Sequence, residues 1–377
     1  MHQFKFHGKG KEYFGIWIVN ILLSIITLGI YSAWAKVRTN KYFYGNTELS
    51  GDRFDYLAQP KQILIGRIIA VIAVIAVSIW AALNAFSPQL AVLVMLIFVL
   101  IYPVLVVRNL RFDMKMTQFR NVRFNFIGSY KNAYKVMLVK PLAAYISIGI
   151  SIAITLTYIM PASKILGIII MAVTCLLILP LLFSWVIAAM NQFIINNTRY
   201  GNLTFAATLQ TTYIFKVLAK FMLLMVLIIA VFAAFLIIAG VSTNDVSNLT
   251  GDSSKMAVFV IAYIGMILGM IFTQVYFHVR IRNYILSATK LDNQLQPKST
   301  MTVMSYSLLL LTNLLLIVCT LGLARPFTMI RHANYIASVT QVDGDLSLTS
   351  ATDQITNESG AIADELSQAF DLNISAI

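Results

Sequence analysis

Six long apolar stretches, arranged as three consecutive pairs, limit what this chain can fold into more than any other feature. They cover residues 63–86 and 90–107, 139–160 and 165–190, and 217–241 and 256–279. A helix crosses a bilayer with roughly 20 apolar residues, so each stretch is long enough. Charged residues make up only 11% of the chain, against about 25% in an ordinary soluble domain. The sequence therefore predicts an integral membrane protein with six full transmembrane helices.

A stretch near the start of the chain recurs near its end at a constant offset. Asn20 matches Asn313 and Asp52 matches Asp345, since 313 − 20 and 345 − 52 both equal 293. Each copy also carries the string Thr-Leu-Gly inside a short apolar run. Because no gap is needed between the matches, the two ends of the chain are predicted to fold alike.

These two terminal segments are shorter than the central pairs. Each has two arms of roughly 16 residues, which as helices reach about 24 Å and fall short of the roughly 30 Å hydrocarbon core. We therefore expect two re-entrant helical hairpins that enter the membrane and return on the same side. Their tips are expected at Thr27 to Gly29 and at Thr320 to Gly322, with glycine supplying the tight reversal.

Each unit ends with the same spacing of residue types. An arginine is followed by an aromatic residue after four positions and a threonine after nine, in the series Arg38/Tyr42/Thr47, Arg108/Phe112/Thr117, Arg280/Tyr284/Thr289 and Arg331/Tyr335/Thr340. The third unit keeps Phe193 and Thr198 but has Ala189 in place of the arginine. An apolar residue and a turn containing Asn, Asp or Gly come next, a pattern typical of β-hairpins. The expected fold class is an all-α membrane protein, with six full transmembrane helices flanked by two short re-entrant helical hairpins and with short cytoplasmic β-hairpins between the units.

These repeats predict a division of the chain into a polytopic membrane domain, residues 1–349, and a polar acidic tail, residues 350–377. The membrane domain consists of five helical-hairpin units, at about 4–47, 54–117, 124–198, 205–289 and 295–340. The tail is expected to be solvated in the cytoplasm, because its acidic residues leave little apolar surface to bury.

The positive charges indicate which side of the membrane the connectors occupy. Only Lys164 and Lys255, of 28 Lys and Arg residues, fall in loops of the opposite side, which leaves 26 (28 − 2) on the connector side. By the positive-inside rule, the connectors and both termini are predicted to be cytoplasmic. The net charge of +13 is attributed to this topology rather than to nucleic-acid binding.

Part of the first repeat resembles a known family. The residues that carry the resemblance are Thr27-Leu-Gly-Ile-Tyr31, Trp34, Arg38, Tyr42 and Asn46-Thr47, together with Phe4-Lys-Phe6-His-Gly8 near the start. They are similar to the YjgN-like family of bacterial inner-membrane proteins, and the similarity runs to about Thr349. Ala33 stands where the family usually has proline before the tryptophan. The resemblance implies a bacterial inner-membrane location and a common fold, and it implies no activity.

Signals for chemistry are missing from the sequence. None of the fifteen acidic residues falls in the middle of a predicted span, where ionisable groups usually mark function. The four histidines form no metal-binding pair, and Cys175 and Cys319 have no partner at zinc-ligand spacing. No GxSxG or phosphate-loop motif is present. The sequence therefore predicts a protein that is not an enzyme and holds no metal or cofactor.

Two asparagines recur inside the terminal hairpins, Asn20 in the first and Asn313 in the second. One interpretation is hydrogen bonding between helices, which contributes about 0.6 kcal/mol on average in membranes. The other is that they line a polar passage together with the tip residues Thr27, Gly29, Thr320 and Gly322, as broken helices do in transporters. The pattern leaves both interpretations open.

The repeated arginines give a second functional hypothesis. Arg38, Arg108, Arg280 and Arg331 occur in register on the basic side, where arginine can bind anionic lipid head groups. Anchoring of the topology explains basic charge equally well, and a helix end accounts for arginine followed by a polar terminator.

Two classes of function follow from these patterns. The first is a channel- or transporter-like passage for an unidentified solute, which the repeated hairpins favour. The alternative is a non-catalytic membrane protein that binds anionic lipid or a protein partner through its basic cytoplasmic face. The lipid bilayer is the expected environment, anionic phospholipid is a candidate partner, and homo-oligomerisation is left open.

Overall fold

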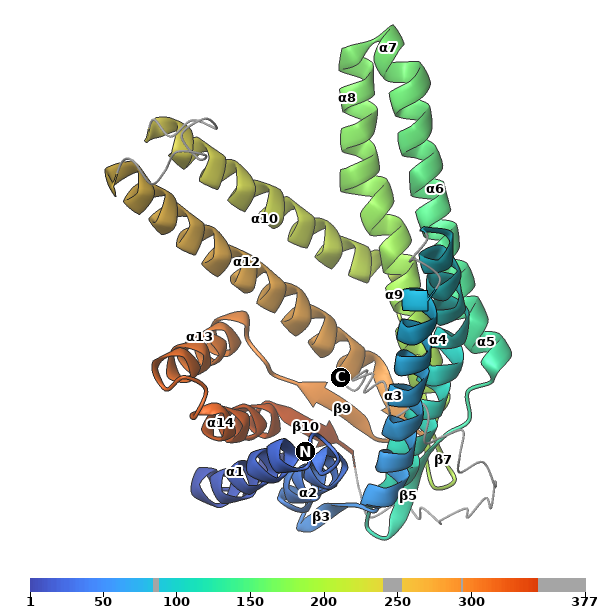
Figure 1. Ribbon diagram of the computed structural model, residues 1–377, viewed down its shortest axis with the longest axis vertical. Helices are drawn as coiled ribbons and strands as arrows, with labels where there is room; N and C mark the ends of the chain where they lie inside the picture. Colours follow the sequence, from blue (N-terminus) through green and yellow to red (C-terminus); the bar gives the residue numbers. More distant parts are fainter. Residues whose placement is uncertain (84–87, 240–252, 293, 345–377) are drawn as a thin grey trace.

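The computed structural model describes residues 1–83, 88–239, 253–292 and 294–344. The expected tail at 350–377 lies outside the described residues. Within them, helical hairpins of different lengths leave a common base of short strands (Figure 1). The molecule therefore has two parts, a strand base and the helices that project from it.

Ten short strands form one antiparallel sheet. They are β1 (His2–Phe6), β2 (Thr47–Leu49), β3 (Asp52–Tyr56), β4 (Thr117–Phe119), β5 (Val122–Phe126), β6 (Thr198–Tyr200), β7 (Leu203–Ala207), β8 (Thr289–Leu291), β9 (Gln296–Ser299) and β10 (Thr340–Asp343). Their order is β8-β7-β6-β5-β4-β3-β2-β1-β10-β9. The outer strands β8 and β9 are also joined, because Leu291 in β8 and Leu295, directly before β9, exchange two backbone hydrogen bonds of 2.8 and 3.1 Å. The sheet therefore closes on itself, and we call it the strand ring.

Each of five units consists of a strand, a helical hairpin and a second strand. The hairpins are α1 (Gly10–Ile26) with α2 (Ser32–Gly45), α3 (Pro60–Leu83) with α4 (Pro88–Met116), α10 (Thr211–Ile238) with α12 (Ser253–Ala288), and α13 (Val303–Cys319) with α14 (Arg325–Ser338). The third hairpin has α5 (Tyr130–Tyr134), α6 (Lys140–Ile154) and α7 (Met160–Ala162) on one side and α8 (Lys164–Val173) and α9 (Leu179–Asn196) on the other. Three π-helical segments interrupt it, at Lys135–Val139, Thr155–Ile159 and Thr174–Ile178.

The two strands that flank each hairpin pair with each other, so all hairpins leave the ring at one end. We call this the helix end. At the opposite end, the turn end, the chain passes from one unit to the next through tight turns. Several turn residues have left-handed backbone conformations with φ from 48° to 61°: Ser50, Arg120, Asn121, Gly201 and Asp292. The hairpins and the turns are thereby kept on opposite ends of the ring.

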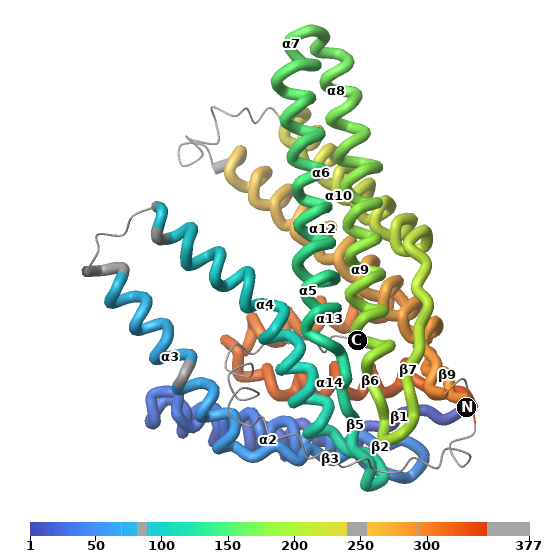
Figure 2. The backbone as a smooth tube through the Cα atoms, turned by 90° about the vertical axis from the view of Figure 1, so that its right-hand side faces the viewer, coloured from blue at the N-terminus to red at the C-terminus, as the bar shows by residue number. Residues whose placement is uncertain are grey.

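The units are arranged in a circle, because one type of contact repeats between neighbours. The second helix of each unit packs on the first strand of the next, α2 on β3, α4 on β5, α9 on β7 and α12 on β9. The last unit packs on the first in the same way, through α14 on β1. Strands β10 and β1 also pair there, with His2 opposite Val342. In both views α6 and α8 lie side by side, and the hairpins point in different directions from the ring (Figures 1 and 2).

Five threonines mark the change from helix to strand. Each is the first residue of the strand that follows a hairpin, and its hydroxyl donates to the carbonyl four residues earlier at 2.6 to 2.8 Å: Thr47, Thr117, Thr198, Thr289 and Thr340. The last carbonyls of a helix have no backbone partner, so each hydroxyl satisfies one of them. This bond explains why threonine recurs nine residues after the repeated arginine position.

Six helices among the described residues are long and apolar enough to cross a membrane. They are Pro60–Trp80, Ala91–Met116, Tyr130–Ala162, Lys164–Asn196, Thr211–Ile238 and Lys255–Ala288. Many of their large apolar side chains are exposed, as expected for surfaces that face lipid. The expectation of a mostly helical protein with six apolar helices is confirmed.

The expectation of separate short β-hairpins, and with it the all-α class, was incomplete. Strands also pair within units across long stretches of chain, such as Phe54 opposite Phe119, 65 positions apart (119 − 54). A helical hairpin separates these partners, so no local turn signal marks their pairing in the sequence. The hairpins between units therefore merge into one ring.

Candidate functional site

The strand ring encloses a cavity of about 580 Å³. Every strand contributes at least one residue to its lining. Ten of these residues, one from each strand, form five cross-strand pairs: Phe4–Leu49, Phe54–Phe119, Phe124–Tyr200, Phe205–Leu291 and Pro297–Val342. Each pair joins the two strands that flank one hairpin. Equivalent positions of the five units thus build one continuous apolar wall.

Aromatic rings make up most of this wall. The Phe54 and Phe119 rings stack with centroids 4.6 Å apart, and those of Phe124 and Tyr200 lie 4.9 Å apart. Phe4 continues the series beside Phe54 at 6.1 Å. Such pairs contribute about 0.5–1.5 kcal/mol beyond the burial of their area, which makes the wall rigid as well as apolar. A wall of this kind suits a ligand with an apolar body.

Charge is already paired at the turn end of the cavity. Arg120 Nε lies 2.5 Å from Asp52 Oδ2, and the hydroxyl of Tyr200 donates to the carbonyl of Phe119 at 2.9 Å. Burial raises the pKa of Tyr200 to about 12, an effect that the nearby Arg120 charge opposes and the Asp52 charge increases. The phenol therefore stays neutral at physiological pH. The Arg120 charge at this end of the cavity is already paired with Asp52.

The helix end of the cavity contains a buried arginine. Arg282 on α12 lines the cavity and is only 7% exposed. Its two terminal nitrogens donate to hydroxyls of the fifth unit, Nη1 to Ser299 Oγ at 2.5 Å and Nη2 to Thr340 Oγ1 at 2.7 Å. Within the described ranges no carboxylate forms an ion pair with it. Arg282 therefore brings a positive charge to the cavity without an acidic partner from the described chain.

His332 lies at the same end, on α14. Its Nε2 is 3.2 Å from the hydroxyl of Tyr306, and Tyr306 stacks on His278 with ring centroids 5.6 Å apart. Burial lowers the pKa of His332, and the charges of His278 and Arg282 lower it further. The imidazole is therefore neutral near pH 7 and, with its proton on Nδ1, accepts from the Tyr306 hydroxyl.

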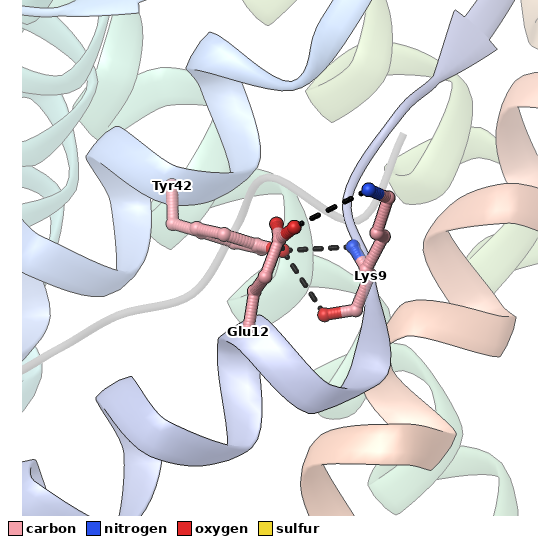
Figure 3. A network of polar contacts seen from close by, with 3 residues as sticks. All are labelled: Lys9, Glu12 and Tyr42. Carbon is pink, nitrogen blue, oxygen red and sulfur yellow. Dashed lines mark hydrogen bonds and ion pairs between the residues drawn. The ribbon is translucent and has the colours of Figure 1, made fainter.

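The repeated aromatic residue at the end of the second helix closes the base of its hairpin. In the first unit the Tyr42 hydroxyl accepts from the backbone N–H of Lys9 at 2.8 Å and lies 3.1 Å from the Lys9 carbonyl (Figure 3). Glu12 completes this network, 3.4 Å from the same hydroxyl and 3.5 Å from Lys9 Nζ (Figure 3). In the fourth unit the Tyr284 hydroxyl accepts from the N–H of Gln210 at 2.6 Å. Both tyrosines therefore satisfy a backbone group where the first helix begins.

The two Thr-Leu-Gly strings form identical helix-ending turns. Gly29 N–H donates to Ser24 O at 2.7 Å, as Gly322 N–H does to Ile317 O at 2.8 Å, the long bond of a Schellman motif. Gly29 and Gly322 have φ of 90° and 92°, and Leu28 and Leu321 both have φ of 49°. Thr27 and Thr320 each bond the carbonyl four residues earlier at 2.7 Å and accept the N–H four residues later at 2.9 Å.

These tips do not meet in the structure. Leu28 is 94% exposed and Leu321 is 95% exposed, so neither packs on another described residue. Asn20 and Asn313 do lie inside, 6% and 7% exposed, and each has a side-chain oxygen without a hydrogen-bond partner among the described residues. The two asparagines lie on different helices. Asn20 is on α1, which contacts α2 and α14, whereas Asn313 is on α13, which contacts α12 and α14. No hydrogen bond joins the two asparagines in the described ranges.

The repeated arginines are likewise not gathered into one site. Arg38, Arg280 and Arg331 are exposed, and Arg108 is half-buried with its Nε 3.4 Å from the Tyr130 hydroxyl. Arg331 reaches Thr312 Oγ1 at 3.0 Å. None of the four lines the cavity. Each lies on the outer part of its own unit.

Sequence reasoning missed Arg282 and His332, two polar residues at the helix end of the cavity. A weak signal existed for each. Two positions after the repeated arginine the five units have Asn40, Leu110, Asn191, Arg282 and Ala333, so the fourth unit carries a charge there. His332 replaces Thr39 at the offset of 293. Without knowledge of the ring, nothing in the sequence says which side of these helices faces a cavity.

No group of three or more His, Cys, Asp or Glu side chains suited to a metal occurs among the described residues.

In comparisons with known proteins, residues 1–369 match a family described as "Bacterial protein of unknown function (DUF898)". The chain is 28% identical over 358 residues to "Inner membrane protein YjgN" of Escherichia coli (strain K12), a match that covers 92% of this chain and 89% of that protein. It is 26% identical over 359 residues to the protein of the same name from Salmonella typhimurium (strain LT2), with the same coverage. No solved structure matches.

Proposed function

The chain belongs to the DUF898 family of bacterial proteins, and we propose that it is a non-catalytic inner-membrane protein that binds a small apolar molecule inside its strand ring. The cavity carries this proposal. At about 580 Å³ it has the size of a small-molecule site, and each of the ten strands contributes an apolar side chain to its wall. An aromatic wall of this kind favours apolar ligands.

The proposed position of the ring is the cytoplasmic surface of the membrane. Positive charge supports it, because 26 of 28 Lys and Arg residues fall on the connector side of the predicted topology (28 − 2). In this arrangement both termini are cytoplasmic. The hairpins α1–α2 and α13–α14 enter the membrane without crossing it, since a helix of 17 or 14 residues reaches about 25 or 21 Å.

The cavity then opens near the lipid surface, where apolar and amphipathic molecules concentrate. The proposed ligand is again of a lipid type, but its site is the inner wall of the ring and not the repeated arginines. The apolar contacts come from the inner wall of the ring, while the exposed Arg38, Arg280 and Arg331 contact lipid head groups around the outside.

Photolabelling tests the proposal. The protein, reconstituted in nanodiscs of zwitterionic lipid, is irradiated with a methyl laurate analogue that carries a diazirine on its chain, and the modified residues are mapped by mass spectrometry. Adducts on wall residues such as Phe119 and Leu291 are expected, and excess methyl laurate should suppress them. Adducts confined to the outer surfaces of the six apolar helices would contradict the proposal.

A matched pair of variants separates the cavity from the membrane surface. Ala333 lines the cavity, so Ala333→Phe should fill part of it and reduce wall labelling at least about tenfold, which corresponds to about 1.4 kcal/mol. Asn334 is exposed on the same helix, so Asn334→Phe adds the same side chain outside the cavity and should leave wall labelling unchanged.

A passage for a solute is the second candidate, and the unpartnered side-chain oxygens of Asn20 and Asn313 favour it. Buried polar atoms normally have partners, so water or a solute would satisfy them. Planar-bilayer conductance that is lost in the double variant Asn20→Leu with Asn313→Leu would support a passage. Equal conductance in a folded double variant would contradict it.

A further inference from the structure

The charge balance of the cavity is positive. Among the residues that line it, all of which lie in the described ranges, two are arginines and none is acidic. Arg120 at the turn end is paired with Asp52 at 2.5 Å. His332 at the helix end is neutral near pH 7, because burial lowers its pKa. The charge that faces the cavity without an acidic partner is therefore that of Arg282.

Arg282 retains donors for a further partner. A guanidinium has five N–H groups, and the bonds to Ser299 and Thr340 use one on each terminal nitrogen. The Thr340 hydroxyl gives its own proton to the Ile336 carbonyl at 2.6 Å, so toward Arg282 it acts only as an acceptor. Both partners are neutral. A buried positive charge held by neutral groups is costly until an anion pairs with it.

We infer that the ligand of the strand ring is a single-chain amphipathic acid, whose carboxylate binds Arg282 and whose apolar chain lies along the aromatic wall. This inference rests on the proposed binding function and adds the chemical class of the ligand. Arginine pairs with a carboxylate through parallel N–H···O bonds, which fixes the head group at the helix end. The chain then extends from Arg282 toward Phe54 and Phe119.

The fit depends on both parts of the ligand. A neutral chain of the same length gains the wall contacts but leaves the Arg282 charge unpaired. A cationic amphiphile places a like charge beside Arg282 and is rejected. The cavity should therefore prefer laurate to methyl laurate, and methyl laurate to dodecyltrimethylammonium.

Competition measures this preference. Nanodisc-embedded protein is labelled with the diazirine analogue of lauric acid at pH 7.5 in the presence of laurate, methyl laurate or dodecyltrimethylammonium. The measured quantity is the decrease in adducts on wall residues that each competitor causes. Laurate should compete about ten- to a hundredfold better than methyl laurate, the range expected for one charged hydrogen-bonded pair. Equal competition by laurate and methyl laurate would overturn the inference and leave the proposed apolar site standing. No competition by either would overturn both.

Variants of α12 identify the group responsible. Arg282→Gln should remove the advantage of laurate over methyl laurate. The matched control is Arg280→Gln, which removes an exposed arginine two residues earlier and should preserve the advantage. An advantage retained in folded Arg282→Gln protein would overturn the inference.

Arg282 also ties α12 to β9 and β10, so its replacement can affect folding. Ser299→Ala provides a second test, because it frees one guanidinium N–H while the charge remains. Laurate should bind this variant at least as tightly as the wild-type protein. A loss of the laurate advantage in folded Ser299→Ala protein would contradict a role for Arg282 as the head-group site.

Discussion

The ring of Tyr306 stacks on the ring of Tyr335 with centroids 5.7 Å apart, and Tyr13 stacks on Tyr42 in the same way at 5.3 Å. The two pairs are related by the offset of 293 residues, since 306 − 13 and 335 − 42 give the same number. The second tyrosine of each pair also bonds the start of its hairpin, Tyr42 at Lys9 and Tyr335 at Ser305 Oγ, 2.5 Å away. The first and last hairpins therefore have the same packing at their bases and the same turns at their tips.

This base contact predicts a measurable loss in the fourth unit. Tyr284→Phe removes the acceptor of the Gln210 N–H, and it should lower the free energy of unfolding by about 1 kcal/mol. The second and third units carry Phe112 and Phe193 at this position, so the ring itself is tolerated. Thermal unfolding in detergent measures the change. Tyr213→Phe is the matched control, because Tyr213 stacks on Tyr284 at 4.1 Å through its ring and should lose much less stability.

The tip of the first hairpin predicts opposite effects for two glycines of the same segment. Gly29 has φ of 90°, so Gly29→Ala forces a β-carbon into a left-handed turn and should destabilise the protein by about 1–2 kcal/mol. Gly15 lies within α1 with open space around it, so Gly15→Ala should stabilise by about 0.5–1 kcal/mol. Comparison of their unfolding temperatures tests the turn. Similar effects of the two substitutions would contradict it.

Burial of Tyr200 predicts a loss of stability in strong alkali. Its pKa is about 12 in the folded protein and about 10 when unfolded, so folding favours the protonated phenol. This contribution is fully present below pH 10 and is lost as the pH rises from 10 to 12, by roughly 2–3 kcal/mol. Tyr200→Phe has no phenol to ionise. The stability difference between wild type and variant should therefore shift in favour of the variant over this pH range, and a constant difference would contradict the raised pKa.

The sequence predicted the elements whose signals are local. Six apolar runs predicted six apolar helices, and the spacing from arginine to threonine predicted where each hairpin ends and a strand begins. The Thr27 hydroxyl and its counterpart Thr320 lie in turns that the Thr-Leu-Gly strings indicated. The apolar runs are read from composition and length, and the turns depend on bonds within about five residues, so both can be predicted without knowledge of the tertiary fold.

The ring and its cavity depend on contacts that the sequence does not record. Phe4 and Leu49 pair although a helical hairpin separates them in the chain, so no local turn signal marks their pairing. The role of Arg282 could not be predicted, because its partners Ser299 and Thr340 belong to another unit. The predicted tips form turns, with Gly29 and Gly322 in left-handed conformations. A passage lined by these tips stays a prediction.

Re-entry of the two short hairpins predicts a specific labelling pattern. After replacement of Cys175 and Cys319, single cysteines are introduced at the tips as Leu28→Cys and Leu321→Cys and treated with membrane-impermeant thiol reagents from each side. Each hairpin is made of one helix of 17 residues and one of 14, which are too short to cross the hydrocarbon core, so both tips should be protected from both sides. The exposed apolar tip side chains would then be covered by lipid.

Two control positions show whether the thiol reagents reach each side of the membrane. Ser50→Cys, at the turn end of the strand ring, should react only from the cytoplasmic side. Lys164→Cys, at the start of α8, should react only from the opposite side. Reaction of Leu28→Cys from the same side as Lys164→Cys would mean that the first hairpin crosses the membrane, because its tip would then lie in the opposite aqueous phase. Reaction of both tip cysteines from the cytoplasmic side would place the hairpins on the membrane surface. Only protection of both tips, with the expected reactions at the two controls, agrees with hairpins that enter the membrane and return.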